Sequence, residues 1–244
     1  MLIYGIHPVL EALRAGRVRE VRVGDRSDAR VAEVLRAAER AAVPVKKVTS
    51  QELDRQVRGA THQNVVADLG EARTVQVRDL VAVKNGVAPL IVVLDGIEDP
   101  HNLGAILRTV DAAGASGLVR QSRRAARLEG AAAKASAGAI SHVQIAEVVN
   151  VARAIEELKE LGVWTIGLDG DADKSYVDMD LTLPTAFVLG AEGHGLRRLV
   201  RDRCDWLVAI PMHGHVGSLN VSVAAAVALF EAVRQRSVGR RSPT

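Results

Sequence analysis

The chain has 244 residues, of which 48% are hydrophobic and 25% are charged, and its formal net charge is +3. This length is enough for one large domain or two small ones, and the composition is ordinary for a globular protein. No apolar run approaches the roughly 18 residues of a membrane span, and the first residues lack the pattern of a secretory signal. The single cysteine, Cys204, excludes an internal disulfide and a cysteine-based zinc site. These features together predict a cytoplasmic protein.

Positive charge is concentrated in the first third of the chain. Residues 1–87 contain 15 Lys and Arg against 11 Asp and Glu, a net charge of +4, whereas residues 88–244 carry a net charge of −1. Such an excess is a weak indication of a polyanionic partner, and an ordinary solvated surface explains it about equally well. With only six aromatic residues, a base-stacking platform is not expected. Any RNA recognition should rest on phosphates and on RNA shape.

The first 69 residues alternate between short helices and strands. Their apolar spacing predicts helices at residues 7–13, 28–42 and 50–57, and strands at residues 20–23, 45–48 and 64–69. Ser50 is the expected cap of the third helix. The alternation predicts a small α/β domain, which we place at residues 1–75. The polar stretch that follows lacks a clear pattern, and we place a linker at residues 76–87.

A second α/β domain is expected over residues 88–244. It opens with a β-branched run at residues 90–94, which suits a buried parallel strand. Further helices are predicted at residues 103–113, 129–139, 151–161 and 219–235, and strands at 117–119, 142–145, 163–167, 186–189 and 206–210. This order predicts a mostly parallel sheet. Because ligands bind beyond the carboxyl ends of such strands, the segments after Leu94, Leu189 and Ile210 are the candidate site.

The segment after Leu94 reads Asp-Pro-His-Asn-Leu-Gly-Ala-Ile-Leu-Arg over residues 99–108. Asn102 lies near the expected helix start, where an asparagine often caps the helix. Arg108 follows six residues later on the same helix. Taken alone, a capped helix with a surface arginine is the more common explanation of this pattern.

The other two segments combine glycine with polar residues. In residues 189–195 three glycines surround Glu192, which allows close backbone approach to a ligand, although the spacing is not that of a dinucleotide-binding loop. In residues 210–222, Ser218, Asn220 and Ser222 open an apolar helix. Capping accounts for Ser218. Asn220 and Ser222 are poor helix formers, and their presence suggests contacts with a ligand or with another chain.

No metal site is predicted. Asp169, Asp171 and Asp173 imitate the start of a calcium-binding loop, but its sixth position is Lys174 rather than glycine and its twelfth is Asp180 rather than glutamate. The histidines of the glycine-containing loops have no cysteine and carboxylate set to complete a transition-metal site; these are His194, His213 and His215.

In this order and at these strand ends, the three segments resemble the three motifs of the SpoU/TrmH family of RNA ribose methyltransferases. The run Ser-Leu-Asn-Val-Ser-Val-Ala-Ala-Ala at residues 218–226 is the most diagnostic. Residues 4–13 and 61–67 are similar to the substrate-binding domain of the bacterial subgroup that methylates a guanosine in the peptidyl-transferase region of 23S rRNA. The resemblance covers nearly the whole chain apart from the linker and the tail after about Arg236. Asn64 stands where relatives usually have glycine. Asparagine tolerates the left-handed backbone conformation that glycine adopts, so the substitution is compatible with the fold.

This resemblance implies a fold and an activity. The expected fold is a small RNA-binding α/β domain followed by a methyltransferase domain with a trefoil knot, which composition and periodicity would never indicate. The knot would form a pocket for S-adenosylmethionine, and the protein would be a homodimer. The implied reaction is 2′-O-methylation of a ribose in RNA, with no metal, no DNA and no membrane involved.

The resemblance also implies roles for individual residues. Arg108 would stabilise the developing alkoxide, or act as a base in a strongly perturbing site, and Asn102 would orient it. Glu192 would pair with Arg108 or hold the loop, while Ser218 and Asn220 would position the substrate or the arginine. The implied cofactor-binding residues are Leu189, Gly190, Glu192, Gly193, Ile210, Met212, Ser218 and Leu219.

Three other functions remain open. The first is a relative that acts on tRNA or confers antibiotic resistance through rRNA, although tRNA enzymes of the family commonly lack this type of N-terminal domain. The second is a non-catalytic RNA-binding or ribosome-assembly protein, against which the complete set of candidate catalytic residues argues. The third, a nicotinamide enzyme, lacks the dinucleotide-binding pattern.

Overall fold

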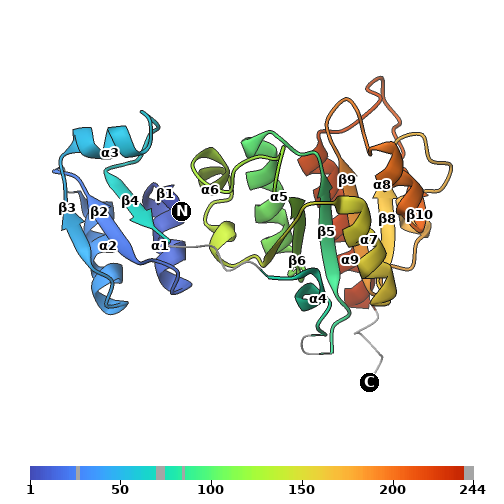
Figure 1. Ribbon diagram of the computed structural model, residues 1–244, viewed down its shortest axis with the longest axis horizontal. Coiled ribbons are helices and arrows are strands. Elements are labelled where there is room, and N and C mark those ends of the chain that lie inside the picture. Colours follow the sequence, from blue (N-terminus) through green and yellow to red (C-terminus); the bar gives the residue numbers. More distant parts are fainter. Residues whose placement is uncertain (26–27, 70–74, 84–85, 239–244) are drawn as a thin grey trace. The chain divides into compact units, whose positions relative to one another are not determined.

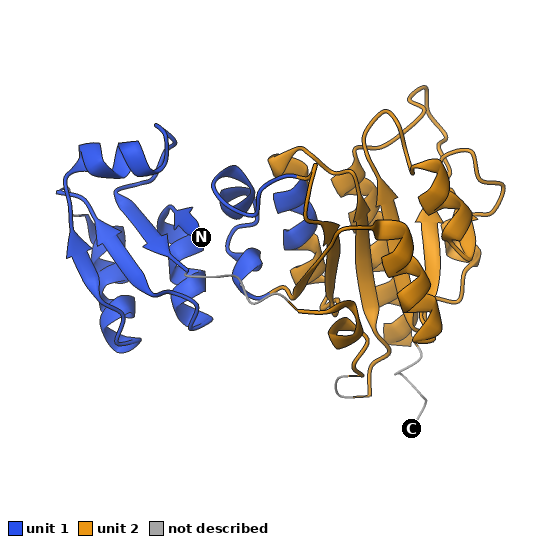
Figure 2. Ribbon diagram, viewed as in Figure 1, with its two compact units in different colours: residues 1–73, 103–108, 126–142 blue, residues 74–102, 109–125, 143–244 orange. Residues whose placement is uncertain are grey.

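The computed structural model describes residues 1–25, 28–69, 75–83 and 86–238 (Figure 1). The chain divides into two compact units (Figure 2). Unit 1 contains residues 1–73, 103–108 and 126–142, and unit 2 contains residues 74–102, 109–125 and 143–244. No helix within the described ranges combines the length and the apolar character needed to cross a membrane.

Unit 1 is built on a four-stranded sheet in the order β1-β4-β2-β3. The strands are β1 (Leu2–Tyr4), β2 (Glu20–Val23), β3 (Val45–Lys47) and β4 (Val65–Asp68), and the helices are α1 (Ile6–Arg14), α2 (Ala29–Arg40) and α3 (Ser50–Gln56). β4 is antiparallel to β1 and β2, whereas β2 and β3 are parallel. The three helices and three strands predicted here are confirmed. β1 was not predicted.

The helix starts in unit 1 are set by local side-chain capping. Asp28 accepts hydrogen bonds from the backbone N–H groups of Arg30 and Val31 at the start of α2. The prediction that Ser50 caps α3 is wrong. The cap is Thr49, which forms a reciprocal capping box with Glu52 and so satisfies two backbone donors.

A later segment, residues 126–142, belongs to unit 1. It contains the short helices α6 (Ala131–Ala135), which contacts β1, and η1 (Ala139–Ser141), which contacts α1. Arg17 Nη1 donates to the Ser141 carbonyl at 3.4 Å, and a Cβ on Gly138 would overlap the Glu11 side chain. The compact unit therefore differs from the predicted domain at residues 1–75, since these contacts join segments more than 120 residues apart.

Unit 2 is built on a six-stranded sheet in the order β10-β8-β9-β5-β6-β7, and each of its strand pairs is parallel. The strands are β5 (Leu90–Asp95), β6 (Gly117–Gln121), β7 (Ile145–Val148), β8 (Trp164–Leu168), β9 (Thr185–Gly190) and β10 (Trp206–Val208). Every residue of β5 is buried. The predicted parallel sheet is confirmed, although β7 begins three residues later than expected.

The helices of unit 2 are α4 (Val77–Leu80), α7 (Val151–Glu160), α8 (Arg198–Arg203) and α9 (Val221–Val238), together with the two ends of α5 (Pro100–Ala112), whose residues 103–108 are assigned to unit 1. Figure 1 shows α7 in front of the sheet and α9 behind it. α4 lies within the stretch expected to be a linker, yet Val77 and Leu80 are buried in the core with Ile155 and Leu158 of α7. α8 was not predicted. The helix expected at 129–139 is shorter: α6 ends at Ala135, and Ala137, two residues later, has a left-handed φ of 50°.

Candidate active site

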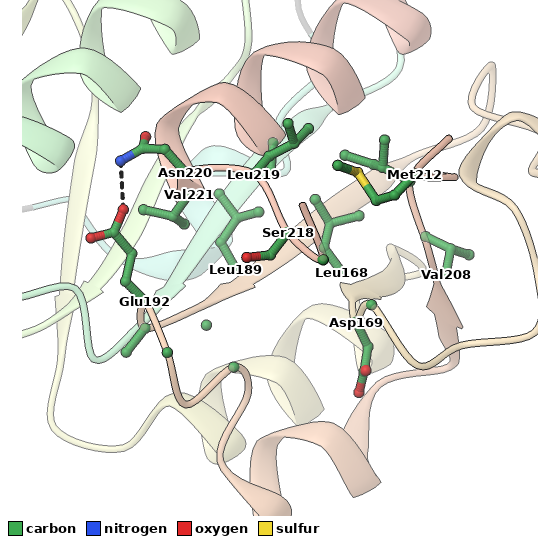
Figure 3. Close-up of a pocket in the computed structure, with 18 residues that line it drawn as sticks. Leu168, Asp169, Leu189, Glu192, Val208, Met212, Ser218, Leu219, Asn220 and Val221 are labelled. Atoms are coloured by element: carbon green, nitrogen blue, oxygen red, sulfur yellow. Dashed lines mark hydrogen bonds between the residues drawn. The ribbon is translucent and has the colours of Figure 1, made fainter. Parts of the chain in front are cut away.

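A pocket of about 610 Å³ lies beyond the carboxyl ends of β8, β9 and β10 (Figure 3). Four segments line it, at residues 168–170, 189–195, 208–212 and 217–224. Two of the segments singled out in the sequence, those after Leu189 and Ile210, line this pocket. The contribution from the end of β8 was missed, although its position directly after a predicted parallel strand was a usable signal.

The pocket brings together all eight residues that the resemblance implied for the cofactor, namely Leu189, Gly190, Glu192, Gly193, Ile210, Met212, Ser218 and Leu219. Figure 3 shows Met212 and Val208 on one side and the pair formed by Glu192 and Asn220 on the other. Apolar side chains from three strand ends therefore form much of the wall. Polar groups are concentrated near the start of α9.

Asp169 also lines this pocket, at the end of β8. Its carboxylate accepts a hydrogen bond from the Asp171 N–H and pairs with Arg201 Nε at 2.7 Å. Within the described ranges, no group of three His, Cys, Asp or Glu side chains is placed to hold a metal ion. Burial raises the pKa of the Cys204 thiol to about 12, and this residue is therefore a protonated thiol at neutral pH.

The glycine-rich loop after β9 folds back on itself. Gly195 N–H donates to the Ala191 carbonyl at 2.9 Å, and a Cβ on Gly190 would overlap the backbone of Gly195. Gly193 and Gly195 have φ values of 75° and 63°, which side chains with a Cβ rarely adopt. The loop is therefore a main-chain wall that a ligand can approach closely.

Asn220 caps α9. Its carbonyl accepts the N–H groups of Val223 and Ala224, and its Oδ1 accepts the N–H of Ser222 at 2.9 Å. Capping explains a polar residue that would be unfavourable inside the helix. The expectation that Ser218 is the cap and that Asn220 lies within the helix is wrong. Ser218 instead lines the pocket three residues before α9 begins.

The cap also fixes the orientation of the Asn220 amide. Because Oδ1 faces the helix, Nδ2 points away from it and donates to Asn102 Oδ1 at 2.9 Å. It also donates to Glu192 Oε1 (Figure 3). Asn102 is 7% exposed. Its Nδ2 group has no hydrogen-bond partner among the residues that the structure describes. Three segments far apart in sequence thus meet through one asparagine side chain.

A second pocket, of about 390 Å³, adjoins the first. It is lined by residues 96–99 after β5, by Asn102 and His194, and by three residues that also line the first pocket, namely Ala191, Glu192 and Val221. The lining includes the carboxylates of Glu98, Asp99 and Glu192 and no lysine or arginine. The segment after Leu94 therefore contributes to the site as predicted, through a neighbouring pocket.

The first turn of α5 differs from the prediction. Asp99 caps the helix by accepting the His101 N–H at 2.9 Å, whereas Asn102 lies within the first turn. Arg108 is exposed and lies six residues further, about 9 Å along the helix axis and on a different face. In the part of the chain that the structure describes, Asn102 and Glu192 pair with Asn220 and not with Arg108.

Comparison with known proteins places this geometry in a family. Residues 89–230 match the model of the SpoU rRNA methylase family, and residues 2–75 match that of the RNA 2′-O ribose methyltransferase substrate-binding domain. The 23S rRNA (guanosine-2′-O-)-methyltransferase RlmB of Yersinia pestis is 44% identical over 241 residues, which cover 97% of this chain and 98% of the relative.

Similar solved structures support the same family. The SpoU methyltransferase AviRb from Streptomyces viridochromogenes aligns with a TM-score of 0.82 and 28% identity over 99% of this chain and 91% of AviRb. Its complex with the cofactor AdoMet aligns with a TM-score of 0.81 and 27% identity over 98% of this chain and 91% of AviRb. With both family models matched and near-complete coverage by relatives, the chain belongs to the SpoU rRNA methylase family.

Proposed function

We propose that this protein transfers a methyl group from S-adenosylmethionine to the 2′-hydroxyl of a guanosine ribose in 23S rRNA, in the peptidyl-transferase region. The observation that carries the proposal is the pair of adjoining pockets, which share the wall formed by Ala191, Glu192 and Val221. A methyl donor and a nucleoside can lie side by side there. The named activity of RlmB relatives over nearly the full chain supports the substrate.

The larger pocket fits S-adenosylmethionine. Its volume lies within the range of small-molecule sites, and its walls are mostly apolar with a few polar groups. Gly193 and Gly195 line this pocket with open space where a Cβ would lie, so the loop offers main-chain groups to an adenosine. Leu189, Ile210 and Leu219 would hold the cofactor, with Met212 beside them. The bound cofactor supplies a methyl group that its sulfonium already makes electrophilic, so that no metal is required.

The smaller pocket would receive the target ribose. Asn102 lines it, and its Nδ2, which has no partner among the described residues, can donate a hydrogen bond to a ribose oxygen. Three carboxylates and no cation line this pocket. Phosphates are therefore disfavoured inside it, and the sugar or the base is the part of a nucleotide that suits it. Glu192 and Asn220 hold the wall between the two ligands.

The chemical step needs alignment and charge stabilisation. Bound S-adenosylmethionine would supply the methyl group, and the site would have to orient the ribose oxygen toward it while the hydroxyl proton leaves to a base or to water. Arg108 would stabilise the negative charge that develops on the oxygen. It is an exposed guanidinium on the helix that carries Asn102, on another face of that helix, and it lines neither pocket of its own chain. Ser218, which lines the cofactor pocket, would help to position the reactants.

Unit 1 would supply RNA affinity. The basic excess of residues 1–87 supports this role, as does the match of residues 2–75 to an RNA methyltransferase substrate-binding domain. The edge strand β3 carries Lys46 and Lys47, both exposed. Exposed lysines can neutralise phosphates without reading sequence.

The proposed assembly is a cytoplasmic homodimer in which the C-terminal segment forms a trefoil knot. Support comes from α9, whose Ala225, Ala228 and Ala232 are buried while Val223 and Phe230, on the opposite face, are 46% and 49% exposed. A second copy of this chain would cover that apolar face. Sedimentation of the purified protein tests the dimer, and Phe230→Glu should shift it toward a monomer.

Mapping of ribose methylation on 23S rRNA tests the function directly. Cells that lack the gene should lose one 2′-O-methyl group at a guanosine, and reintroducing the gene should restore it. Calorimetry should show that the purified protein binds S-adenosylmethionine. An unchanged methylation map together with no cofactor binding by the folded protein would contradict the proposal.

A further inference from the structure

A buried carboxylate lies behind the glycine-rich loop without lining either pocket. Asp95, the last residue of β5, is 1% exposed, and its side chain is fully buried. A buried carboxylate is costly unless charged and hydrogen-bonding partners compensate it. Its presence at the carboxyl end of the central strand calls for an explanation from the contacts it makes.

The backbone of Asp95 marks the start of the loop. In the ladder between β5 and β9, Asp95 is the register partner of Gly190, the residue from which the loop departs. β9 lies between β8 and β5, and the start of the loop is thus tied to the middle of the sheet.

The carboxylate of the same residue binds the far end of the loop. Asp95 Oδ2 accepts the backbone N–H of Arg197 at 2.9 Å. Asp95 Oδ1 accepts Arg197 Nε at 2.6 Å and also pairs with Nη2. When the Gln121 amide is oriented with its oxygen toward Arg197, that oxygen accepts Nη1 at 3.3 Å and Nη2 at 3.0 Å. Arg197, the residue before α8, is therefore bound to the ends of both β5 and β6.

Five of the six residues between these two anchors line one or both pockets. Ala191, Glu192, Gly193 and Gly195 line the larger pocket, and Ala191, Glu192 and His194 line the smaller one. Glu192 also accepts the hydrogen bond from Asn220. A shift of the loop would therefore change the wall of both pockets and the position of Glu192 together.

We propose that Asp95 and Arg197 are a positioning pair that clamps residues 191–196 at both ends and so sets the relative placement of the two ligands. This inference rests on the proposed methyl transfer between the two pockets. Neither residue lines a pocket, so both act through the loop. The pair was not among the residues singled out in the sequence, since only the fold brings positions 95 and 197 together.

The test compares four variants of the full-length protein. Arg197→Ala removes the guanidinium contacts, Arg197→Lys keeps a charge but not the fork, and Asp95→Asn/Arg197→Ala removes both charges and so avoids an unpaired buried carboxylate. Arg198→Ala is the matched control, because Arg198 is the next residue, has a side chain 96% exposed and pairs with Asp202 at 3.8 Å.

The clamp predicts a loosened loop and weaker binding. In Arg197→Ala and in the double variant, amide hydrogen exchange at residues 191–196 should accelerate and affinity for S-adenosylmethionine should fall about tenfold, the scale of one lost charge-assisted hydrogen bond. Single-turnover methylation with both substrates saturating should fall by a further factor of about ten. Arg197→Lys should recover part of each loss, and Arg198→Ala should match the wild type.

Two results would overturn the clamp. In the first, Arg197→Ala keeps wild-type affinity, rate and loop exchange. In the second, the double variant regains wild-type behaviour, which would mean that Arg197 only neutralises a buried charge. Hydrogen exchange at residues 191–196 needs no ligand and so tests the clamp independently. If the wild-type protein failed to bind S-adenosylmethionine, that failure would count against the proposed function instead.

Discussion

Both units of this chain are α/β, but their sheets are built differently. In unit 1 the strand β4 runs antiparallel to its two neighbours, so that the loops after these strands leave from opposite edges of the sheet. In unit 2 every strand pair is parallel, and the loops after β5, β8, β9 and β10 leave from a single edge. Both pockets described above lie at that edge.

This difference between the two sheets suggests that unit 2 encloses the ligands and that unit 1 contacts the RNA. A parallel sheet collects several loops at one place, where they can enclose two ligands. The mixed sheet of unit 1 instead offers an exposed edge strand, β3, with all three residues exposed and two of them lysines. We therefore expect substitutions at the parallel edge to change the chemical step, and substitutions on β3 to change only RNA affinity.

The largest expected effect comes from Arg108. Arg108→Ala should lower the single-turnover rate roughly 10²-fold or more, the scale for losing one group that stabilises transition-state charge. Affinity for S-adenosylmethionine should be kept. Arg108→Lys should restore little, because an ammonium does not reproduce the guanidinium fork. A near-normal rate at saturating RNA, with weaker RNA binding, would make Arg108 a phosphate contact only.

A substitution at Asn220 can distinguish its role as helix cap from its hydrogen bonds at the pocket. Asn220→Asp keeps an oxygen for the Ser222 N–H but replaces the donor that reaches Asn102 and Glu192. The single-turnover rate should fall about 10-fold to 100-fold, the scale of a hydrogen bond to a charged group, while thermal stability changes little. The control is Asn150→Asp, since Asn150 caps α7 by accepting the Arg153 N–H. Equal losses of activity in both variants would contradict the role of the network.

Substitution of the β3 lysines tests whether unit 1 contributes to RNA affinity. Lys46→Gln/Lys47→Gln should weaken binding of the rRNA fragment several-fold and lower the slope of log affinity against log salt by about one to two. The rate at saturating RNA should not change. Arg153→Gln, at an exposed position on α7 of unit 2, is the control and should leave the slope unchanged. An unchanged slope in the lysine variant would exclude β3 from the RNA interface.

The smallest expected effect concerns stability in acid. Burial alone would raise the pKa of Asp205, but hydrogen bonds from Lys159 and from Thr165 outweigh it and lower the pKa below its usual value. The stabilisation is therefore present above the unfolded pKa of about 3.9 and is lost as pH falls through the folded value. Asp205→Asn should lower the melting temperature by about 2–4 °C at pH 7.

The matched control for this effect is Asp202→Asn, because Asp202 forms only an exposed pair with Arg198. Its melting temperature at pH 7 should stay within about a degree of the wild type, as expected for a surface ion pair. The difference between wild type and Asp205→Asn should shrink at pH 3. A difference that stays constant from pH 7 to pH 3 would show that the Asp205 carboxylate does not contribute through its charge.

Periodicity predicted the elements with a regular apolar pattern. The strand at residues 20–23 coincides with β2, and the run at 90–94 is β5 with one residue added. β1 and α8 were missed, and the six residues of α8 span less than two turns, which is too short to show the helical period. The stretch expected to be a linker contains α4. Val77 and Leu80 of this helix are buried only because the folded chain packs them in one core with α7, which their local sequence does not indicate.

The sequence by itself also determined where to look for the site, because the carboxyl ends of parallel strands share one edge. The order of those strands, the second pocket and the orientation of the Asn220 amide were decided by the tertiary structure. So was the pairing of Asp95 with Arg197, which are 102 residues apart. Local preference acts over a few residues, whereas these contacts depend on which loops the folded sheet places side by side.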